Sequence, residues 1–197
     1  MNAPLDDKSL RQLFTEARTT GKFRDEPVTD EQLRAIWDLA KWGPTSMNGL
    51  PMRLVFVKSA AAKEKLKPAL SEGNLAKTMA APATIVVATD YAFFERMPRL
   101  FPSFPGARDL FAGNAKLAET TAFRNATLQG AYVIMAARAL GLDCGPMSGF
   151  DNAKVDEAFF AGTAVRSNFL INIGYGVPGS AHPRGPRPDF AEDCRIL

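Results

Sequence analysis

Cysteine and histidine are scarce in this sequence, which has two cysteines and one histidine among 197 residues. Cys144 and Cys194 form no CxxC pair, and His182 has no second histidine to pair with. A structural zinc site needs four such ligands, and a Ser-His-Asp triad needs a histidine held by a carboxylate, so we expect neither. So few cysteines and no apolar leader, because Asp6, Asp7 and Lys8 interrupt the N-terminus, favour the reducing cytoplasm.

Long apolar runs and runs of like charge are also missing. The most apolar stretch, residues 126–140, contains Gln129 and Arg138 and is too short and too polar to span a bilayer. The 24 basic and 21 acidic residues are scattered, which gives no basis for nucleic acid binding. With 46% hydrophobic residues, the chain can bury one sizeable core, so we expect a single domain over residues 1–197.

What is present is a series of helix and strand patterns. Apolar residues at helical spacing predict helices, which we place at residues 7–20, 29–42, 116–140 and 151–158, with another from about 59 that Pro68 ends or kinks. The second helix begins with a Thr29-x-x-Gln32 capping box. Short apolar runs predict buried strands at residues 54–57, 83–89 and 168–173, and residues 143–151 are expected to form a tight loop.

Two segments are irregular. Residues 90–114 contain three prolines and five phenylalanines and cannot form one regular helix; they predict either an aromatic lid over a site or a local core. Residues 177–197 contain four prolines and predict an extended arm without a helix.

Residues 41–53 form a loop between a helix and a strand. Gly43 and Pro44 stop the helix, and short hydrogen-bonding side chains follow before the apolar run begins. A loop of this composition can hold a ligand, or it can simply cap a helix and turn the chain at the surface.

Residues 174–179 match GxGxxG after a strand, but the sequence does not predict the helix that a dinucleotide fingerprint needs directly after them. Prolines follow instead, so we reject a Rossmann site there.

A set of short motifs, taken in order, resembles the FMN-dependent nitroreductase family over nearly the whole chain. The motifs are Arg18-Thr19 followed by Phe23, then Pro44, Thr45, Ser46, Asn48 and Pro51, then Asn74-x-x-Lys77, and last Pro146, Met147, Ser148 and Gly149 before Phe150.

The resemblance implies an α+β nitroreductase-like three-layer fold, with a central mixed β-sheet flanked by helices. It also implies an intertwined homodimer with an extended C-terminal arm, an FMN cofactor, and NADH or NADPH as electron donor. By the same resemblance, the 44–48 segment serves the flavin of the neighbouring subunit.

The resemblance also assigns roles in the site. Arg18 and Thr19 would hold the flavin phosphate, Asn74 and Lys77 would lie at the pyrimidine ring, and residues 146–149 would lie over the isoalloxazine. Ala17, Gly21, Leu50 and Ser148 depart from the family pattern, so Arg187, with Arg184 as a lesser candidate, is expected to carry more of the phosphate binding. A cation near N1 and O2 stabilises reduced flavin, which makes Lys77 the candidate; no side chain need act as a nucleophile.

Within the family, the Trp42-Gly-Pro-Thr-Ser junction and the 145–151 loop look most like members that reduce malonic semialdehyde to 3-hydroxypropionate in pyrimidine catabolism. The substrate carboxylate needs a cation, and Arg96, Arg99 and Arg108 are the candidates. Two alternatives stay open: a broad nitro- or quinone reductase with the same flavin, and a flavin-binding protein without turnover.

Overall fold

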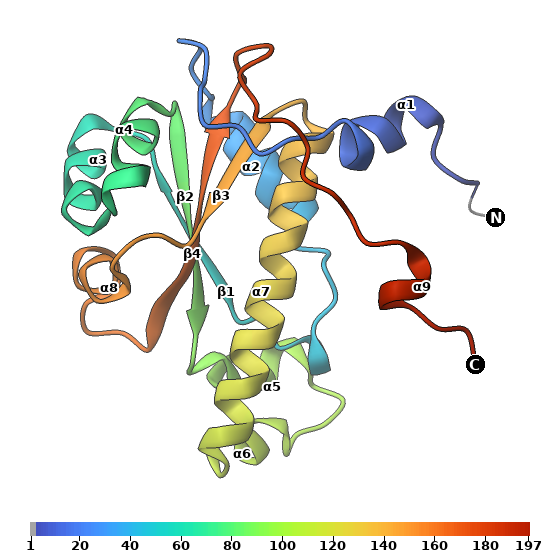
Figure 1. Cartoon of the computed structure of the whole chain (residues 1–197). Helices are drawn as coiled ribbons and strands as arrows, with labels where there is room; N and C mark the ends of the chain where they lie inside the picture. The colour runs from blue at the N-terminus through green and yellow to red at the C-terminus, as the bar shows by residue number, and fades with distance from the viewer. Residues whose placement is uncertain (1–2) are drawn as a thin grey trace.

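The computed structural model describes residues 3–197 and forms three layers around one sheet (Figure 1). Helices α2 (Asp30–Ala40) and α7 (Ala115–Ala139) cover one face of the sheet, with Ile36 and Val133 packed on Ile85. Helices α3 (Ala60–Leu66) and α8 (Asn152–Phe160) cover the other face, with Leu66 and Val155 in a second core. The expected three-layer α+β architecture is confirmed.

The sheet has four strands in the order β1-β2-β4-β3. Their bounds are β1 Met52–Val57, β2 Ala83–Asp90, β3 Asp143–Met147 and β4 Val165–Gly174. All neighbouring strands are antiparallel, so the expectation of a mixed sheet is wrong for the described residues. The reason is that α3 and α4 (Glu72–Ala80) return the chain to the end of the sheet that β1 has just left, and α8 does the same between β3 and β4.

Local capping signals place most helices as the sequence predicts. The Thr29 and Gln32 capping box starts α2, Ser59 caps α3, and Asp151 caps α8. After α3, Pro68 lies in a short 3-10 helix, η3 (Lys67–Ala69), which ends the helical segment. Asn114 caps α7, so this helix also begins and ends within one residue of the prediction.

The first predicted helix is shorter than expected. It consists of α1 (Asp7–Leu10) and a π-helical turn, η1 (Arg11–Thr15), and stops before residue 20. No residue of either turn is buried, and Phe14 is 55% exposed. Its apolar face therefore has little to pack against within the described part of this chain.

Residues 90–114 form a local core. Three short helices, η4 (Phe93–Arg96), α5 (Met97–Leu100) and α6 (Ala107–Ala112), bury Phe93 and Phe111 against Ala118 and Ala122 of α7. Phe93 contacts Phe111 edge to face at 5.0 Å between ring centroids. The segment lies at one end of α7 (Figure 1), which supports the local-core interpretation.

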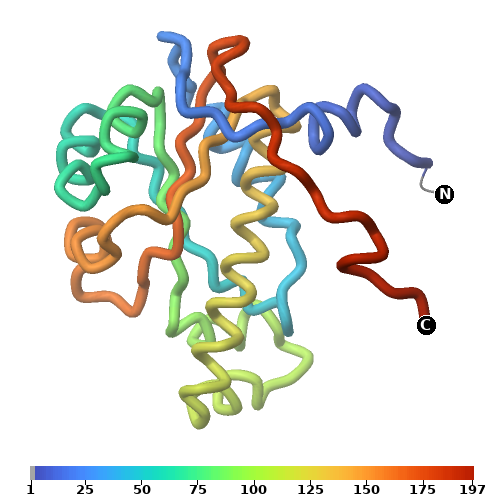
Figure 2. Tube along the Cα trace, viewed as in Figure 1, coloured from blue at the N-terminus to red at the C-terminus, as the bar shows by residue number. Residues whose placement is uncertain are grey.

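Two predictions for the second half are wrong. Residues 143–147 form a strand instead of a loop, because β4 supplies a pairing partner that local propensity does not reveal. The C-terminal arm is extended through its prolines but contains one helical turn, α9 (Phe190–Asp193), started by an Asp189 and Glu192 capping box. Figure 2 shows the arm leaving the body beside the N-terminal segment. Among the described residues no helix is long and apolar enough to cross a membrane.

Candidate active site

The turn after β3 is joined to the start of α4. The Gly149 carbonyl accepts hydrogen bonds from the Asn74 side chain at 2.7 Å and from Ser71 Oγ at 2.6 Å. A Cβ at Gly149 would stand 2.5 Å from Asn74 Nδ2, so any other residue here would displace the Asn74 side chain. The structure thus brings Asn74 together with residues 147–149, as the sequence predicts for two parts of one site.

The loop at residues 18–23 crosses the same strand. Thr19 forms a parallel bridge with Cys144, and Thr20 N donates to the Cys144 carbonyl at 3.0 Å. A Cβ at Gly145 would stand 2.4 Å from the Thr20 carbonyl oxygen, so the loop lies directly on the backbone of β3. Lys77 reaches this loop from α4, since its Cδ would be 3.8 Å from a Cβ at Gly21.

These elements form the first half of the candidate site, which we call the floor. It consists of the 18–23 loop, the end of β3 with the following turn, and the exposed side of α4; its predicted binding residues are Arg18, Thr19, Asn74, Lys77, Pro146, Met147, Ser148 and Gly149. Arg18 also lines a cavity of about 290 Å³ that Arg138 and Asp143 share. The floor combines cations with backbone and amide donors, a set suited to an anionic, hydrogen-bonding ligand.

The arm carries two further arginines that the sequence predicts as phosphate ligands, Arg184 and Arg187. Arg184 donates to the carbonyl oxygens of Thr15 and Ala17 at 2.6 and 2.9 Å, and Arg18 donates to the His182 carbonyl. Arg187 donates to Gly185 and Pro186 in its own segment. Arg184 therefore joins the arm to the start of the 18–23 loop, whereas Arg187 is exposed and remains a predicted phosphate ligand.

The second half of the candidate site is the 44–50 loop. Ser46 N donates to Asn125 Oδ1 of α7 at 2.8 Å, and Asn48 Nδ2 donates to the Leu100 carbonyl at 2.8 Å. Thr45 Oγ1 accepts from Leu50 N at 3.2 Å. Thr45, Ser46 and Asn48 are thus held next to α5 and α7 in the order that the motif requires, with Pro44 at the start of the loop.

The backbone of this loop is strained. Met47, Asn48 and Leu50 have φ values of 50°, 51° and 43°, a region that non-glycine residues rarely occupy. Each costs on the order of 1 kcal/mol or more and persists only where the surroundings fix it, which is typical of binding and catalytic loops.

Two buried amides on α7 support the ends of the loop, and neither belongs to a motif predicted as part of the site. Asn125 accepts from Ser46 N, and Gln129 Oε1 accepts from Met52 N at 3.1 Å. They are four residues apart in the buried stripe of α7. Polar side chains at i and i+4 among alanines are the signal that could have identified them.

The floor and the 44–50 loop do not meet within one chain. Figure 2 shows the 44–50 segment on one side of α7 and the β3–α4 region on the other. The sequence therefore predicts both halves, but a single chain does not assemble them into one pocket.

The predicted substrate arginines differ in their surroundings. Arg108 forms a two-pronged ion pair with Glu95, with both N–O distances 2.9 Å, and also contacts Asp109. Arg99 is exposed, and Arg96 is half-buried near Arg53, whose pKa is lowered mainly by burial. Because Glu95 already balances the charge of Arg108, Arg96 and Arg99 are the better candidates for binding a substrate carboxylate.

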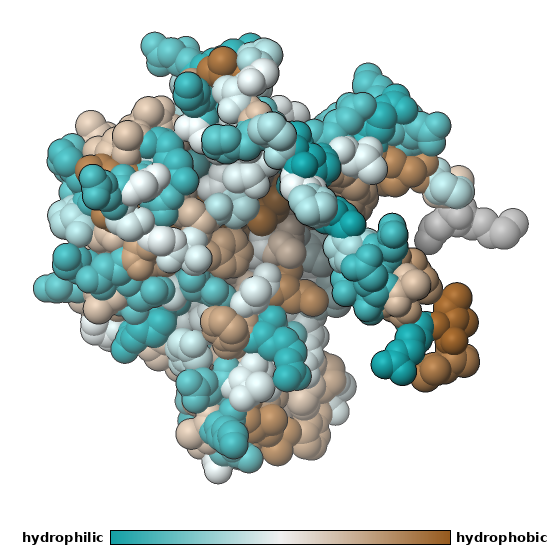
Figure 3. Space-filling model, in the orientation of Figure 1, coloured by the Kyte–Doolittle hydropathy of each residue, from teal (hydrophilic) through white to brown (hydrophobic). Residues whose placement is uncertain are grey.

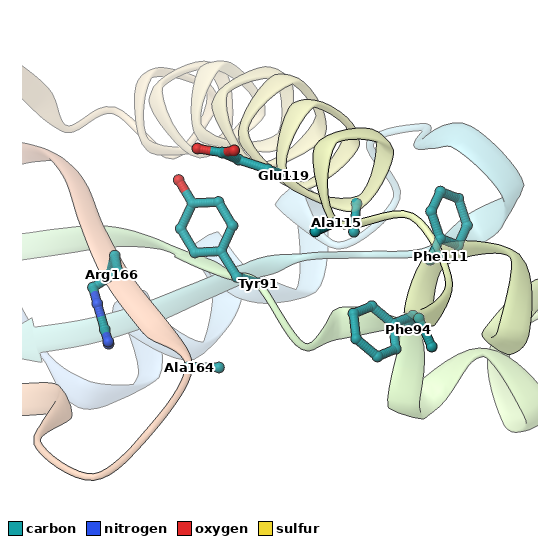
Figure 4. A pocket seen from close by; sticks show the side chains of 9 residues that line it. Tyr91, Phe94, Phe111, Ala115, Glu119, Ala164 and Arg166 are labelled. Atoms are coloured by element: carbon teal, nitrogen blue, oxygen red, sulfur yellow. The ribbon is translucent and has the colours of Figure 1, made fainter.

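A cavity of about 680 Å³ opens between residues 91–112, the start of α7 and residues 164–166 (Figure 4). Phe94, Phe111 and Ala115 form apolar walls, and the Tyr91 hydroxyl points toward Glu119. Burial, followed by the nearby Glu119 charge, raises the pKa of Tyr91, so this phenol stays protonated as a hydrogen-bond donor.

Beneath the floor lies a buried lysine. Lys63 of α3 is 5% exposed, and its Nζ donates to the Thr78 carbonyl at 2.6 Å and to Thr84 Oγ1 at 2.8 Å. Burial lowers the pKa of Lys63 from 10.5 to about 8, because neither acceptor carries a charge that offsets desolvation.

The lowered pKa of Lys63 predicts a pH-dependent stability. Between about pH 8 and 10.5 the unfolded chain binds more protons than the folded chain, so the free energy of unfolding should rise with pH. Relative to Lys63→Met, the wild-type value should increase by about 2 kcal/mol from about pH 7.5 to 9.5. Urea titrations at both pH values measure this difference; a gap between the two proteins that is independent of pH would contradict it, and exposed Lys65→Met is the control.

Comparison with known proteins agrees with this architecture. The nitroreductase family model matches residues 15–175. A Burkholderia lata protein, provisionally named NADH dehydrogenase/NAD(P)H nitroreductase, is 64% identical over 192 residues, which cover 98% of each chain. A Xanthomonas oryzae protein with the same provisional name is 57% identical over 196 residues, which cover 100% of each chain.

Solved structures share the fold at low identity. A crystal structure from Exiguobacterium sibiricum, described as a provisional nitroreductase in complex with FMN, has a TM-score of 0.83 at 18% identity and covers 100% of this chain and 99% of its own. One from Bacillus subtilis has a TM-score of 0.84 at 22% identity, covering 98% and 100%. The chain belongs to the nitroreductase family, a family of flavin-dependent oxidoreductases.

Proposed function

We propose that this protein is a cytoplasmic, homodimeric FMN-dependent NAD(P)H oxidoreductase that reduces malonic semialdehyde to 3-hydroxypropionate in pyrimidine catabolism. The observation that carries the flavin assignment is the floor itself. Loop, strand and helix converge there, with close approaches at Gly145 and Gly149, and bring the predicted flavin-binding residues of three separate segments together. The finer substrate assignment rests on the resemblance of the 42–46 and 145–151 motifs to the semialdehyde-reducing members.

The residues present fit FMN. Arg18 and Thr19, with Arg184 and Arg187 from the arm, supply cations and a hydroxyl for a phosphate. At one edge of the floor, Lys77 supplies a cation and Asn74 an amide oxygen for the polar pyrimidine end of a flavin, since Asn74 Nδ2 already donates to the Gly149 carbonyl. Bound FMN would supply hydride chemistry at N5, and the protein would supply position, charge and exclusion of water.

A dimer would complete the site by adding the partner's 44–50 loop to the floor. Large apolar side chains lie exposed along the surface that would be covered: Trp42 is 78% exposed and Phe123 of α7 is 53% exposed, beside Leu128 and Tyr132. Figure 3 also shows apolar surface at the end of the arm, where Ile196 and Leu197 are exposed. Such a concentration of exposed apolar side chains is typical of a surface that packs against another chain.

The substrate assignment can be tested by comparing kcat/KM for malonic semialdehyde, a nitroaromatic and a quinone, with NADH and with NADPH. We expect the semialdehyde to be the best substrate by at least about tenfold. A higher value for the nitroaromatic or quinone would favour the broad reductase. A yellow protein that NADH does not bleach under anaerobic conditions would favour flavin binding without turnover.

Binding of the substrate carboxylate should depend on Arg96 or Arg99. Replacing the responsible arginine by alanine should raise KM for the semialdehyde by about tenfold or more, because a charge-assisted hydrogen bond contributes about 1.5–3 kcal/mol. Arg108→Ala is the matched control, since Glu95 already occupies this guanidinium. An unchanged KM in both the Arg96 and Arg99 variants would contradict this assignment.

A further inference from the structure

Lys63 is the one charged group in a buried hydrogen-bonded chain behind the floor, counted over residues 3–197. Its ammonium group donates to Thr84 Oγ1 at 2.8 Å, and Thr84 Oγ1 donates to Asn172 Oδ1 at 2.8 Å. Asn172 Nδ2 then donates to Thr78 Oγ1 at 3.1 Å. Lys63, Thr78, Thr84 and Asn172 are all buried, so water does not compete for these bonds.

The chain ends at the floor. Thr78 Oγ1 donates to Met147 Sδ at 3.5 Å. All the hydrogen bonds in the chain therefore run in the same donor-to-acceptor direction, from the ammonium group to the sulfur. Thr78 directly follows Lys77 in α4, and Met147 directly precedes Ser148. Asn172 is paired in register with Gly145, the residue on which the 18–23 loop lies.

This arrangement connects one cation to two elements of the floor, α4 and the end of β3. Lys63 also donates to the Thr78 carbonyl at 2.6 Å, in the last turn of α4, so it fixes the end of the helix that carries Lys77. A buried ammonium group without a carboxylate partner destabilises the fold. A contribution to stability therefore does not explain why a lysine occupies position 63. Its charge is free to act on a ligand above the floor, because no counter-ion within the described residues neutralises it.

We propose that Lys63 is a positioning residue that holds Thr78 and Met147 in place beneath the flavin and whose charge makes the site favour reduced over oxidised FMN. This inference rests on the proposed FMN function. Reduction adds negative charge to the ligand, and a cation in a low-dielectric interior stabilises that charge more than one in water does. Lys63 acts through the chain of neutral groups and does not touch the reacting atoms.

The test is the ratio of the dissociation constants of oxidised and reduced FMN, measured anaerobically on the full-length protein. Lys63→Met should lower the oxidised-to-reduced ratio of Kd values by about tenfold. That change equals a fall of about 30 mV in the two-electron potential of the bound flavin. Lys65→Met removes an exposed charge from the same helix and should leave the ratio within about twofold of wild type.

Thr78→Val separates charge from position. It removes the hydroxyl between Asn172 and Met147 but keeps Lys63 and the carbonyl that it contacts. Both Kd values should therefore rise together, with the ratio unchanged. If Lys63→Met does not fold, as judged by circular dichroism and urea unfolding, Lys63→Gln keeps a neutral donor at the same position and should give the same fall in ratio.

One result would overturn the inference: a neutral residue at position 63 that leaves the ratio unchanged, whether both Kd values stay the same or rise by the same factor. That result would reduce Lys63 to a structural role. Failure of the proposed function is distinguishable, because the wild-type protein would then take up no FMN in either oxidation state.

Discussion

Gly149→Ala should raise the Kd for FMN by at least about tenfold while the protein still folds. The new Cβ would stand 2.5 Å from Asn74 Nδ2 and 2.9 Å from Ser71 Oγ, so both side chains must move. Both currently donate to the Gly149 carbonyl, so the substitution displaces Asn74 and the turn from the positions in which they are proposed to bind FMN. A hydrogen bond contributes about 0.5–1.5 kcal/mol and about 1.4 kcal/mol is tenfold in affinity, so losing the proposed Asn74 contact together with that of the turn accounts for this effect.

Gly73→Ala is the matched control for this prediction. Gly73 lies next to Asn74 in α4, and a Cβ there meets nothing within 4 Å. This change should stabilise the fold by about 0.4–1 kcal/mol, because alanine restricts the unfolded chain, and should leave FMN affinity unchanged. Fluorescence titration of the apoprotein with FMN measures both variants. Wild-type affinity in Gly149→Ala would show that the turn after β3 does not contact the flavin.

Local signals in the sequence predict much of the fold. The capping residues Thr29, Ser59 and Asp151 start their helices where expected, since each accepts a hydrogen bond from a backbone amide within its own first turn. Strand β2 is equally predictable, because its apolar run matches a strand buried on both faces. These features depend on residues that are neighbours in the sequence.

Local signals do not predict the features that depend on residues far apart in the sequence. Gly145 and Pro146 argue against a strand, yet residues 143–147 pair with β4 because their backbone faces an open strand edge. The buried lysine has no sequence signal either, because its acceptors Thr78 and Thr84 lie 15 and 21 positions away. Only the folded chain brings these residues together.

The same limit applies to the candidate site. The motifs at residues 18–19, 74–77 and 146–149, which the family resemblance implies as parts of one site, lie close together on the floor. The 44–50 loop instead packs on α7 and α5, away from the floor. The family resemblance therefore implies the parts of the site, whereas one chain leaves the 44–50 loop and the floor apart, and the dimer that we propose would bring them together.

Mixing two inactive variants should restore activity if the site is shared between subunits. Asn74→Ala damages the floor, and Ser46→Ala with Asn48→Ala damages the loop. In a mixed dimer, the intact floor of one chain faces the intact loop of the other, and the second site contains both damaged halves. Random pairing of equal amounts makes about half of the dimers mixed, and each carries one intact site of two, so activity should reach about one quarter of wild type.

The control for this experiment is each variant alone, which should retain little FMN and little activity under the same dissociation and reassociation treatment. Ser46 and Asn48 are suitable targets because Ser46 is held through its backbone amide, and the Asn48 side chain makes one exposed hydrogen bond, to Leu100. If floor and loop instead served one site within the same chain, every site in the mixture would contain a damaged half. Activity would then remain at the level of the separate variants, which would contradict the shared site.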